Sequence, residues 1–447
     1  MGDYHDLTNM ADTLKTVYDD GLQAQFVEKR SLWGGGEGDA AVLPTSEDDI
    51  GGEGFEFSIQ YARGQGTGFR NESVALPPPL VGKYDKGLIL PKYGYGRLRI
   101  TGPMIEKARK NVQAFVNSLT HSVQDIYESV VTDLNRAAWG DGFGLIATLS
   151  ADSDTVTTSG STTWTVTCDN DQGVERCIEG MLVDFYESTA IDQSTVTSRI
   201  SSVDYVNKTV EMEPNASAYK SYHPIGSGYT IGTPAVTYAS GGYMVAMGSR
   251  LATHDTSADT PIEMTGMEGI FDDGTLLAAF EGITVASYPR WAANVLGNSS
   301  VNRDVSIDLL LQACDATRAR SKMKAGRMYM GLGQRRKYAG LLLPDVRYDA
   351  GKLKGGYEVL TFAGGDGTVE IMVCPEAPTN KIFLEPQGEI KKFVLTPLGW
   401  GSLDQQMHWR SGYDEWDQFL RVYANLGVKR RQCLTLIKDL TEPTKAY

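Results

Sequence analysis

The sequence predicts an α+β fold, because one long helical period and several short strand-like runs occupy different parts of the chain. Apolar residues recur every three or four positions from Met104 to Ala137, which is typical of a helix. Short β-branched runs dominate residues 150–235, and helices and strands alternate after them. With 447 residues, 41% of them hydrophobic, the chain can bury a substantial core, and we expect two or three domains.

Cysteine, histidine and hydropathy patterns exclude several classes of protein. The five cysteines are an odd number with wide spacing, which predicts no disulfide framework and a reducing compartment. The five histidines stand far apart and no CxxC pair occurs, so we expect no metal site and no cofactor. No window approaches the apolar length of a membrane span, and no export signal is evident.

Charge is distributed unevenly along the chain. The formal net charge of −14 disfavours sequence-specific binding of nucleic acid. Residues 1–60 carry thirteen acidic and three basic residues, a net charge of −10, whereas residues 61–101 carry seven basic and two acidic residues, a net charge of +5. Adjacent segments of opposite sign predict a contact, within one chain or between copies.

The predicted contact residues are the basic residues of the second segment and four acids of the first. The basic set is Arg63, Arg70, Lys83, Lys86, Lys92, Arg97 and Arg99. The acidic set is Asp39, Glu47, Asp48 and Asp49.

The N-terminal segment combines a helical pattern with a stretch that cannot fold by itself. Residues 7–30 show apolar steps of three and four, which predict an amphipathic helix whose partner surface is not evident. Residues 31–54 contain three consecutive glycines, a proline and an acidic run. This composition predicts an extended arm.

An extended ribbon should follow the arm. Apolar and polar residues alternate over 55–61 and again over 93–100, which predicts two long strands. Residues 64–91 between them are rich in glycine and proline and too poor in apolar residues for a core. Because a two-stranded ribbon is marginal in water, we expect a neighbouring subunit to support it.

The longest element should be a helix that begins at Pro103 and ends before Gly140. Proline in the first turn and glycine after the last are start and stop signals. About 36 residues with a rise of 1.5 Å per residue correspond to a helix of roughly 54 Å.

Short strands separated by turn residues predict a small all-β insertion over 150–235. Later, helices are expected over 306–320 and 334–343, and strands near 328–330, 369–373, 382–384, 390–395 and 433–437. Trp416, Phe419, Leu420, Tyr423 and Leu426 predict a last helix.

Motifs for catalysis are weak throughout. The glycines from Gly64 to Gly68 have the wrong spacing for a dinucleotide loop, and a loop tip explains them better. Asp414, Glu415 and Asp417 beside Trp416 could form a carboxylate pair next to a sugar-stacking aromatic residue, but a solvated surface is the simpler interpretation. We therefore expect no enzyme.

The order of these elements resembles the major capsid proteins of tailed bacteriophages, which have the Hong Kong 97-type fold. The similarity extends to Gly282-Ile283 through Pro289-Arg290-Trp291, Tyr338 to Leu342, Gly355-Gly356-Tyr357, Arg410 to Trp416, and Tyr423 to Leu426. The resemblance implies an N-terminal arm over 1–54, an E-loop hairpin over 55–102, a peripheral domain with its spine helix over 103–149, an inserted β domain over 150–235, an axial domain with peripheral strands over 236–400, and a return to the peripheral domain over 401–447.

What the resemblance implies is a shell protein that assembles as hexamers and pentamers around double-stranded DNA. It further implies a scaffolding protein, a portal and a cement or decoration protein as partners, assembly in the host cytoplasm, and location in the virion capsid. Some relatives cross-link an E-loop lysine to an asparagine, but no motif here identifies the asparagine. An encapsulin-like nanocompartment and, from another class, a carbohydrate-active enzyme are the alternatives.

Overall fold

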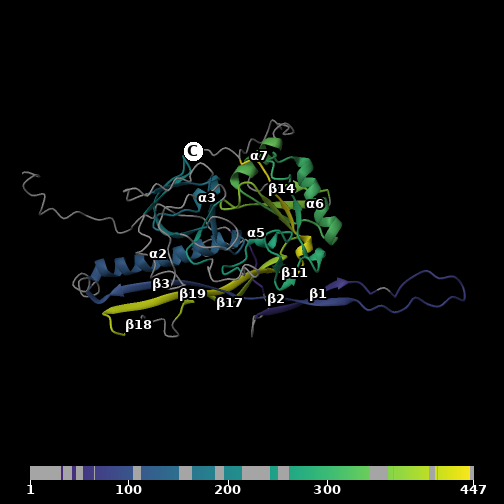
Figure 1. Cartoon of the computed structure of the whole chain (residues 1–447), viewed down its shortest axis with the longest axis horizontal. Coiled ribbons are helices and arrows are strands. Elements are labelled where there is room, and N and C mark those ends of the chain that lie inside the picture. Colours follow the sequence, from purple (N-terminus) through teal and green to yellow (C-terminus); the bar gives the residue numbers. More distant parts are fainter. Residues whose placement is uncertain are drawn as a thin grey trace, which may run out of the picture.

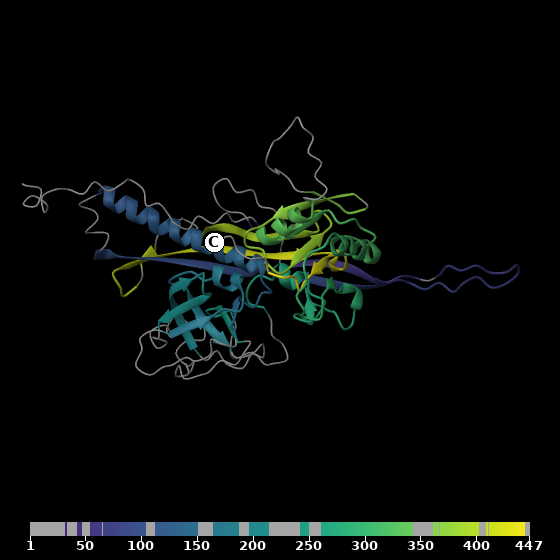
Figure 2. The ribbon, with the colours of Figure 1, turned by 90° about the horizontal axis from the view of Figure 1, so that it is seen from above.

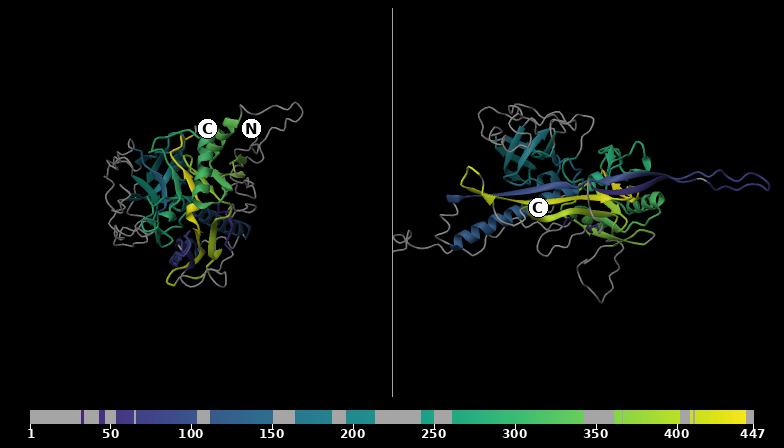
Figure 3. Two further views of the ribbon diagram at one scale, coloured as in Figure 1. Left: turned by 90° about the vertical axis from the view of Figure 1, so that its right-hand side faces the viewer. Right: turned by 90° about the horizontal axis from the view of Figure 1, so that it is seen from below.

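The computed structural model describes thirteen stretches of the chain, and Figure 1 shows their arrangement. They are residues 32–33, 43–46, 54–64, 66–103, 112–150, 164–186, 196–213, 242–249, 261–342, 361–365, 367–401, 408–409 and 411–442. The amphipathic helix predicted over residues 7–30 lies outside these stretches. A body of sheets and helices carries a long two-stranded ribbon, which extends away from it in Figures 1 and 2 and in the right panel of Figure 3.

The long sheet is built around strand β19, Glu415–Val428. On one side it pairs with β17, Ile390–Trp400, and β18, His408–Trp409, and on the other with β3, Lys92–Thr101. Pairing on both edges makes β19 the central strand. The helix predicted at Trp416–Leu426 is therefore wrong.

Both faces of β19 carry apolar residues, and this explains the error. Gln418, Leu420, Val422, Ala424 and Leu426 alternate along the buried face. Trp416 continues this face at its exposed end, whereas Phe419 and Tyr423 lie on the opposite face. When both faces are counted together, apolar residues recur every three or four positions, as in a helix. Each face alone follows the period of two that is typical of a strand.

Helix α2, Val112–Trp139, packs on one face of this sheet and runs above β3 in Figure 1. Its 28 residues correspond to a length of about 42 Å. The close approach needs glycine beneath it, because a Cβ atom at Gly96 would lie 2.5 Å from Val130 and 3.0 Å from Ile126. The predicted long helix is thus present over these residues, while residues 104–111 lie outside the described stretches.

The ribbon differs from the predicted pairing. Strand β1, Phe55–Ala62, pairs antiparallel with β2, Lys83–Ile89, a strand that the glycine- and proline-rich composition of its segment concealed. The run expected as its partner is β3, which joins β19 instead. Only two residues, Leu90 and Pro91, separate β2 from β3, so the chain passes directly from the ribbon into the long sheet.

A second, six-stranded sheet forms the other half of the body. Its strands, in spatial order, are β12 (Asn294–Leu296), β20 (Thr435–Ile437), β16 (Ile382–Glu385), β13 (Arg327–Met330), β15 (Thr368–Val373) and β14 (Thr361–Ala363). Helices α6, Ile307–Ser321, and α7, Leu332–Leu342, belong to this half. The Ser306 hydroxyl caps α6 by accepting from the Leu309 N–H at 3.2 Å.

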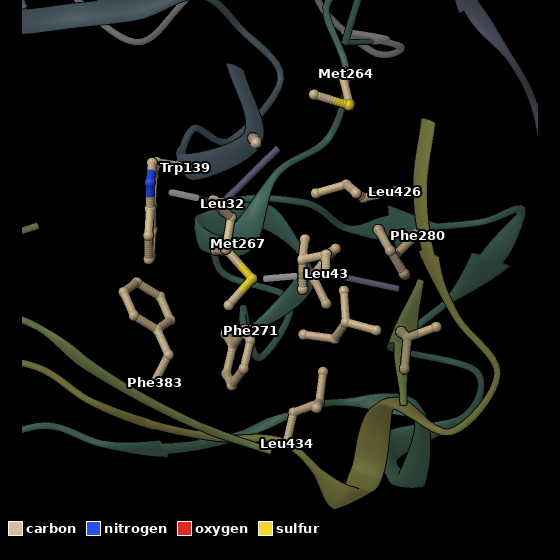
Figure 4. Packing of buried hydrophobic residues seen from close by; sticks show 14 of the residues in the cluster. Leu32, Leu43, Trp139, Met264, Met267, Phe271, Phe280, Phe383, Leu426 and Leu434 are labelled. Carbon is tan, nitrogen blue, oxygen red and sulfur yellow. The ribbon is translucent and has the colours of Figure 1, made fainter. Parts of the chain in front are cut away.

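The main core lies between the two halves (Figure 4). Trp139 at the end of α2 packs on Phe383 of β16, with ring centroids 5.8 Å apart. Phe271, which follows the short helix α5, Met267–Ile270, meets the same ring edge-on. Leu32 and Leu43 from the N-terminal segment are fully buried in this cluster.

Residues around the predicted insertion form a third sheet with its own hydrophobic cluster. In spatial order the strands are β4 (Leu145–Thr148), β9 (Tyr243–Ala246), β6 (Leu182–Tyr186), β7 (Val196–Asp204), β8 (Thr209–Glu213) and β5 (Trp164–Thr167), and the short helix α3 (Asp171–Glu175) packs against β4. Two of these strands, β4 and β9, lie outside the predicted range of 150–235. The unit stands apart from α6 and α7 in Figure 2.

The chain enters and leaves this third sheet at one point. The Ala246 N–H donates to the Gly144 carbonyl at 2.9 Å, so the two ends are already adjacent. We expect the remaining domains to stay folded when residues 145–245 are replaced by a short Gly-Ser linker, because few contacts should cross the boundary. Circular dichroism and thermal melting would check this, and global unfolding of the shortened chain would contradict it.

A narrower deletion provides the control. Removal of residues 152–233 alone would leave β4 and β9 as a two-stranded remnant with Ile146 and Met244 uncovered. We expect this variant to be less soluble than the full excision.

Candidate assembly surfaces

The tip of the ribbon, residues 63–82, exposes apolar side chains to water. Phe69 is fully exposed, at 105%, and Leu76 and Val81 are each 85% exposed. Val74 and Leu80 are also more than half exposed. A cluster of this kind on an extended ribbon is typical of a surface that another molecule covers.

The root of the ribbon, by contrast, is anchored in the main core. Phe57 packs on Trp291 of the short 3-10 helix η4, Pro289–Trp291, with centroids 6.0 Å apart, and Phe55 packs on Phe393 at 5.1 Å. The ring of Phe57 also covers Gly87 on the partner strand, where a Cβ atom would lie 2.4 Å from the ring. The root therefore fixes where the ribbon begins, while the tip has no support of this kind in the described chain.

Three of the predicted basic contact residues are on or beside this tip. Arg63 and Arg70 lie in it and Lys83 begins β2, all three exposed. Within the described stretches none of them forms a salt bridge. Their contact with another copy stays a prediction, and the geometry leaves their charge facing solvent.

The other four basic residues have partners in their own chain. Lys86 pairs with Glu56 across the ribbon, and Lys92, half-buried with its pKa lowered by burial, donates to the Pro261 carbonyl. Arg97 and Arg99 bind Asp417 on the neighbouring strand β19, Arg99 at 3.0 Å. The Lys86 pair therefore links the two strands of the ribbon, and the Arg97 and Arg99 pairs link two strands of the long sheet. The sequence did not reveal the second role, because the pairing of β3 with β19 was unexpected.

The predicted acidic contact residues Asp39, Glu47, Asp48 and Asp49 lie outside the described stretches. Their flanking residues, however, are bound to the body. Thr45 bridges to Lys392 of β17, whose ammonium group donates to the Trp33 carbonyl at 3.1 Å and lies 5.3 Å from the indole centroid. The sequence offers one signal for this anchoring. The large apolar residues nearest the glycine-rich run are Leu32, Trp33 and Leu43.

An aromatic surface, which the sequence analysis also missed, covers the face of β3 and β19 opposite α2. Tyr93 and Tyr95 are each about 60% exposed and meet Tyr423 edge-on, with centroids 5.0 and 5.9 Å apart. The Arg421 guanidinium lies 5.8 Å from the Tyr423 ring. Tyrosine and arginine are the residue types enriched at protein interfaces.

The acids near Trp416 do not form a catalytic pair. Partial burial alone would raise the pKa of Asp417, but hydrogen bonds from Arg97 and Arg99 outweigh it and lower this pKa. A carboxylate held ionised in this way is a poor general acid. Glu415 is 3.5 Å from Arg99 and serves the same strand contact.

Other chemical sites find no support in the described residues. Within these stretches no three His, Cys, Asp or Glu side chains gather as ligands for a metal ion. A hollow lined by Cys314, Arg318 and Gly364 has a volume of about 10 Å³, which is room for about one water molecule. No helix of the described chain is long and apolar enough to cross a membrane.

Comparison with known proteins gives similarity of structure but not of sequence. No protein-family model matches the chain, and no curated protein sequence is significantly similar to it. A chain of the cyanophage A-1(L) capsid asymmetric unit is similar with a TM-score of 0.55 and 11% identity, covering 96% of this chain and 98% of that one.

Two further solved structures are similar with lower scores. They are the capsid of the native GTA particle, with a TM-score of 0.46, 8% identity and coverage of 98% and 99%, and the capsid of Myoviridae phage XM1, with a TM-score of 0.44, 11% identity and coverage of 96% and 98%. Over nearly its whole length, this chain has the fold of the cyanophage A-1(L) capsid chain.

Proposed function

We propose that the chain is the major capsid protein, or major head protein, of a tailed phage. Copies assemble as hexamers and pentamers into the icosahedral shell that encloses double-stranded DNA. The observation that carries this proposal is the fold shared with the cyanophage A-1(L) capsid chain over 96% of this chain. Because a fold alone does not specify a function, the exposed apolar tip supplies independent support for assembly with other copies.

In this proposal each part of the molecule has a role in the shell. The ribbon β1–β2 with its tip is the E-loop, and α2 is the spine helix of the peripheral domain. The sheet that carries α6 and α7 is the axial domain. The third sheet is the inserted β domain, for which the strand pairing favours bounds near Gly144 and Ala246 rather than 150 and 235.

Partners and location follow from the same proposal. A scaffolding protein, a portal and a decoration protein would act with the chain, and assembly would take place in the host cytoplasm before the virion is complete. The net charge of −14 fits a wall along which packaged DNA slides, because an acidic surface repels phosphate. No sequence-specific contact with DNA is required.

Electron microscopy of the purified full chain tests the proposal. We expect closed icosahedral shells, and particles isolated from producing cells should protect double-stranded DNA from nuclease. Shells that hold an enzyme cargo and no DNA would support the nanocompartment alternative instead. A chain that stays monomeric under all assembly conditions and cleaves polysaccharide would overturn the shell function altogether.

A further inference from the structure

The ribbon leaves the body beside a small hairpin with an unusual turn. Strands β10, Ala279–Phe280, and β11, Ile283–Thr284, are joined by Glu281 and Gly282, which have φ angles of 53° and 78°. Such two-residue turns favour asparagine, aspartate or glycine at the first central position. A glutamate there is strained, and strain of this kind persists where the side chain has a role.

Glu281 connects three elements at the root of the ribbon. Its carbonyl accepts the Leu88 N–H of β2 at 2.9 Å. Its carboxyl Oε1 accepts the Val428 N–H at the end of β19 at 3.0 Å. The neighbouring Gly427 permits this approach, because a Cβ atom there would lie 3.0 Å from the same oxygen. The hairpin, the ribbon and the long sheet are therefore joined through one residue, Glu281, by its backbone carbonyl and its carboxyl group. Figure 1 shows β11 beside β2 and the long sheet.

The carboxyl group is held in a water-poor site. Oε2 of Glu281 is buried and has no hydrogen-bond partner among the described residues. Burial raises the pKa of Glu281 to about 8, while the Val428 N–H and the Arg431 charge oppose this shift. The neutral carboxyl is thus favoured below pH 8, and a charge enters the site above it.

Arg431 carries the charge that opposes the pKa shift of Glu281, and it is engaged elsewhere except at Nη1, which is buried and has no hydrogen-bond partner among the described residues. The Arg431 guanidinium of helix η6, Arg431–Cys433, donates to the carbonyls of Gly269 and Ile270, each at 2.8 Å, and lies 3.9 Å from Asp272. It therefore gives a newly charged Glu281 only partial compensation.

Two further charged groups lie at the ribbon root on other elements. Lys429, next to Val428, lies 4.7 Å from the ring centroid of Phe55. On β2, the Asp85 carboxylate forms a hydrogen bond with the Tyr288 hydroxyl and raises the pKa of that tyrosine. Neither replaces the contact between Glu281 and Val428.

We propose that Glu281 is a positioning residue that fixes the direction of the ribbon on the body, and that loss of its buried proton loosens this joint. Below pH 8 the neutral carboxyl keeps Val428 tied to the hairpin, whose Glu281 carbonyl binds Leu88 of the ribbon at every pH. Above pH 8 the unpaired charge draws water into the root, and the ribbon samples a wider range of angles. The joint acts within one subunit and does not depend on whether the chain builds a shell.

Distance measurements between spin labels test the joint in the unassembled full chain. Labels would be attached at Thr67→Cys on the tip and Ala319→Cys on α6, both exposed positions. The five native cysteines are free and buried, so we expect labelling to favour the introduced pair. The wild-type distance distribution should be narrow at pH 6 and broaden with a midpoint near pH 8.

Three variants distinguish the effect of the Glu281 carboxyl group from the effect of the strained turn. Glu281→Gln keeps the acceptor without the charge and should stay narrow at every pH. Glu281→Gly relieves the strained φ angle but removes the carboxyl, so the distribution should be broad at every pH, and the Val428 amide should exchange about tenfold faster, as for a lost hydrogen bond. Glu128→Gln, on the exposed side of α2, is the matched control and should behave as wild type.

The proposal would be overturned by a Glu281→Gly variant with the narrow distribution and slow exchange of wild type. A wild-type distribution that does not change between pH 6 and pH 9.5 would overturn the proton dependence. Because Glu281→Gln retains the fold, this second comparison remains decisive even where the glycine variant fails to fold. Absence of shells would count against the proposed function and not against the joint.

Discussion

Shell formation should be lost when Arg63, Arg70 and Lys83 are all replaced by glutamate. These residues are exposed on or beside the ribbon tip and form no salt bridge within the described stretches, so their charge is available to a neighbouring copy. A single exposed ion pair contributes only about 0.2–1 kcal/mol, but every subunit repeats the contact. The subunit's melting temperature should stay nearly unchanged, because the described chain loses no contact.

Charge-conserving substitutions are the matched control. Arg63→Lys, Arg70→Lys and Lys83→Arg together keep the positive charge, and this variant should assemble normally in electron microscopy and sedimentation. Raised salt should weaken wild-type assembly in the same direction, since the Debye length falls to about 3 Å at 1 M. Normal shells from the triple glutamate variant would remove these charges from the assembly mechanism.

Lys86 belongs to a different class from these three. It was predicted as an equivalent contact, yet it pairs with Glu56 on the adjacent strand, and the hydrogen bond with Glu56 raises the pKa of Lys86. Lys86→Glu should therefore disturb the ribbon itself by opposing two carboxylates across the strands. Combining it with the three tip reversals would confuse a folding defect with an assembly defect.

Replacing Trp139 with alanine should remove most of the folded, soluble protein. Trp139 is fully buried where α2 ends in the main core, and its ring packs on Phe383 (Figure 4). Truncation of a buried tryptophan costs about 3–5 kcal/mol. Because domains are stable by only about 5–15 kcal/mol, this loss is a large fraction of the total.

Tyr127→Ala is the control for this variant, since it removes an aromatic ring from the same helix at a position that is 38% exposed. Thermal unfolding and the soluble yield should change little for it. Equal melting temperatures for the two variants would contradict the placement of α2 against the core. Aspartate at Phe115 or Leu119 should also be disruptive if the apolar stripe continues; both lie in α2, but their side chains fall outside the described residues.

Local sequence patterns were sufficient to predict a helix where the burial of a single face sets the spacing of its apolar residues. The stripe that ends at Ala137 follows a helical period, and α2 ends at Trp139, one residue before Gly140. Helix α6 begins after Ser306, whose hydroxyl caps it, as the start of the predicted segment indicates. In such elements the period and the cap are properties of neighbouring residues, so they can be read without knowledge of the fold.

Pairing between distant strands could not be read in this way. Neither the partner of β1 nor the strand character of Glu415–Val428 follows from neighbouring residues, because both depend on backbone hydrogen bonds to strands far along the chain. The charge pattern predicted Arg97 and Arg99 as contacts between copies. Both bind Asp417 on β19 of their own chain, and a contact with another copy stays a prediction.

The sequence by itself determined the α+β class, the long helix, the β-rich segment near residues 150–235 and the uneven charge, since each is a matter of composition or period. Tertiary structure alone decided which basic residues face solvent, where Leu32 and Leu43 are buried, and how Glu281 meets Leu88 and Val428. The physical reason is that burial and pairing are set by residues hundreds of positions apart, and chain entropy lets many such arrangements compete until packing selects one.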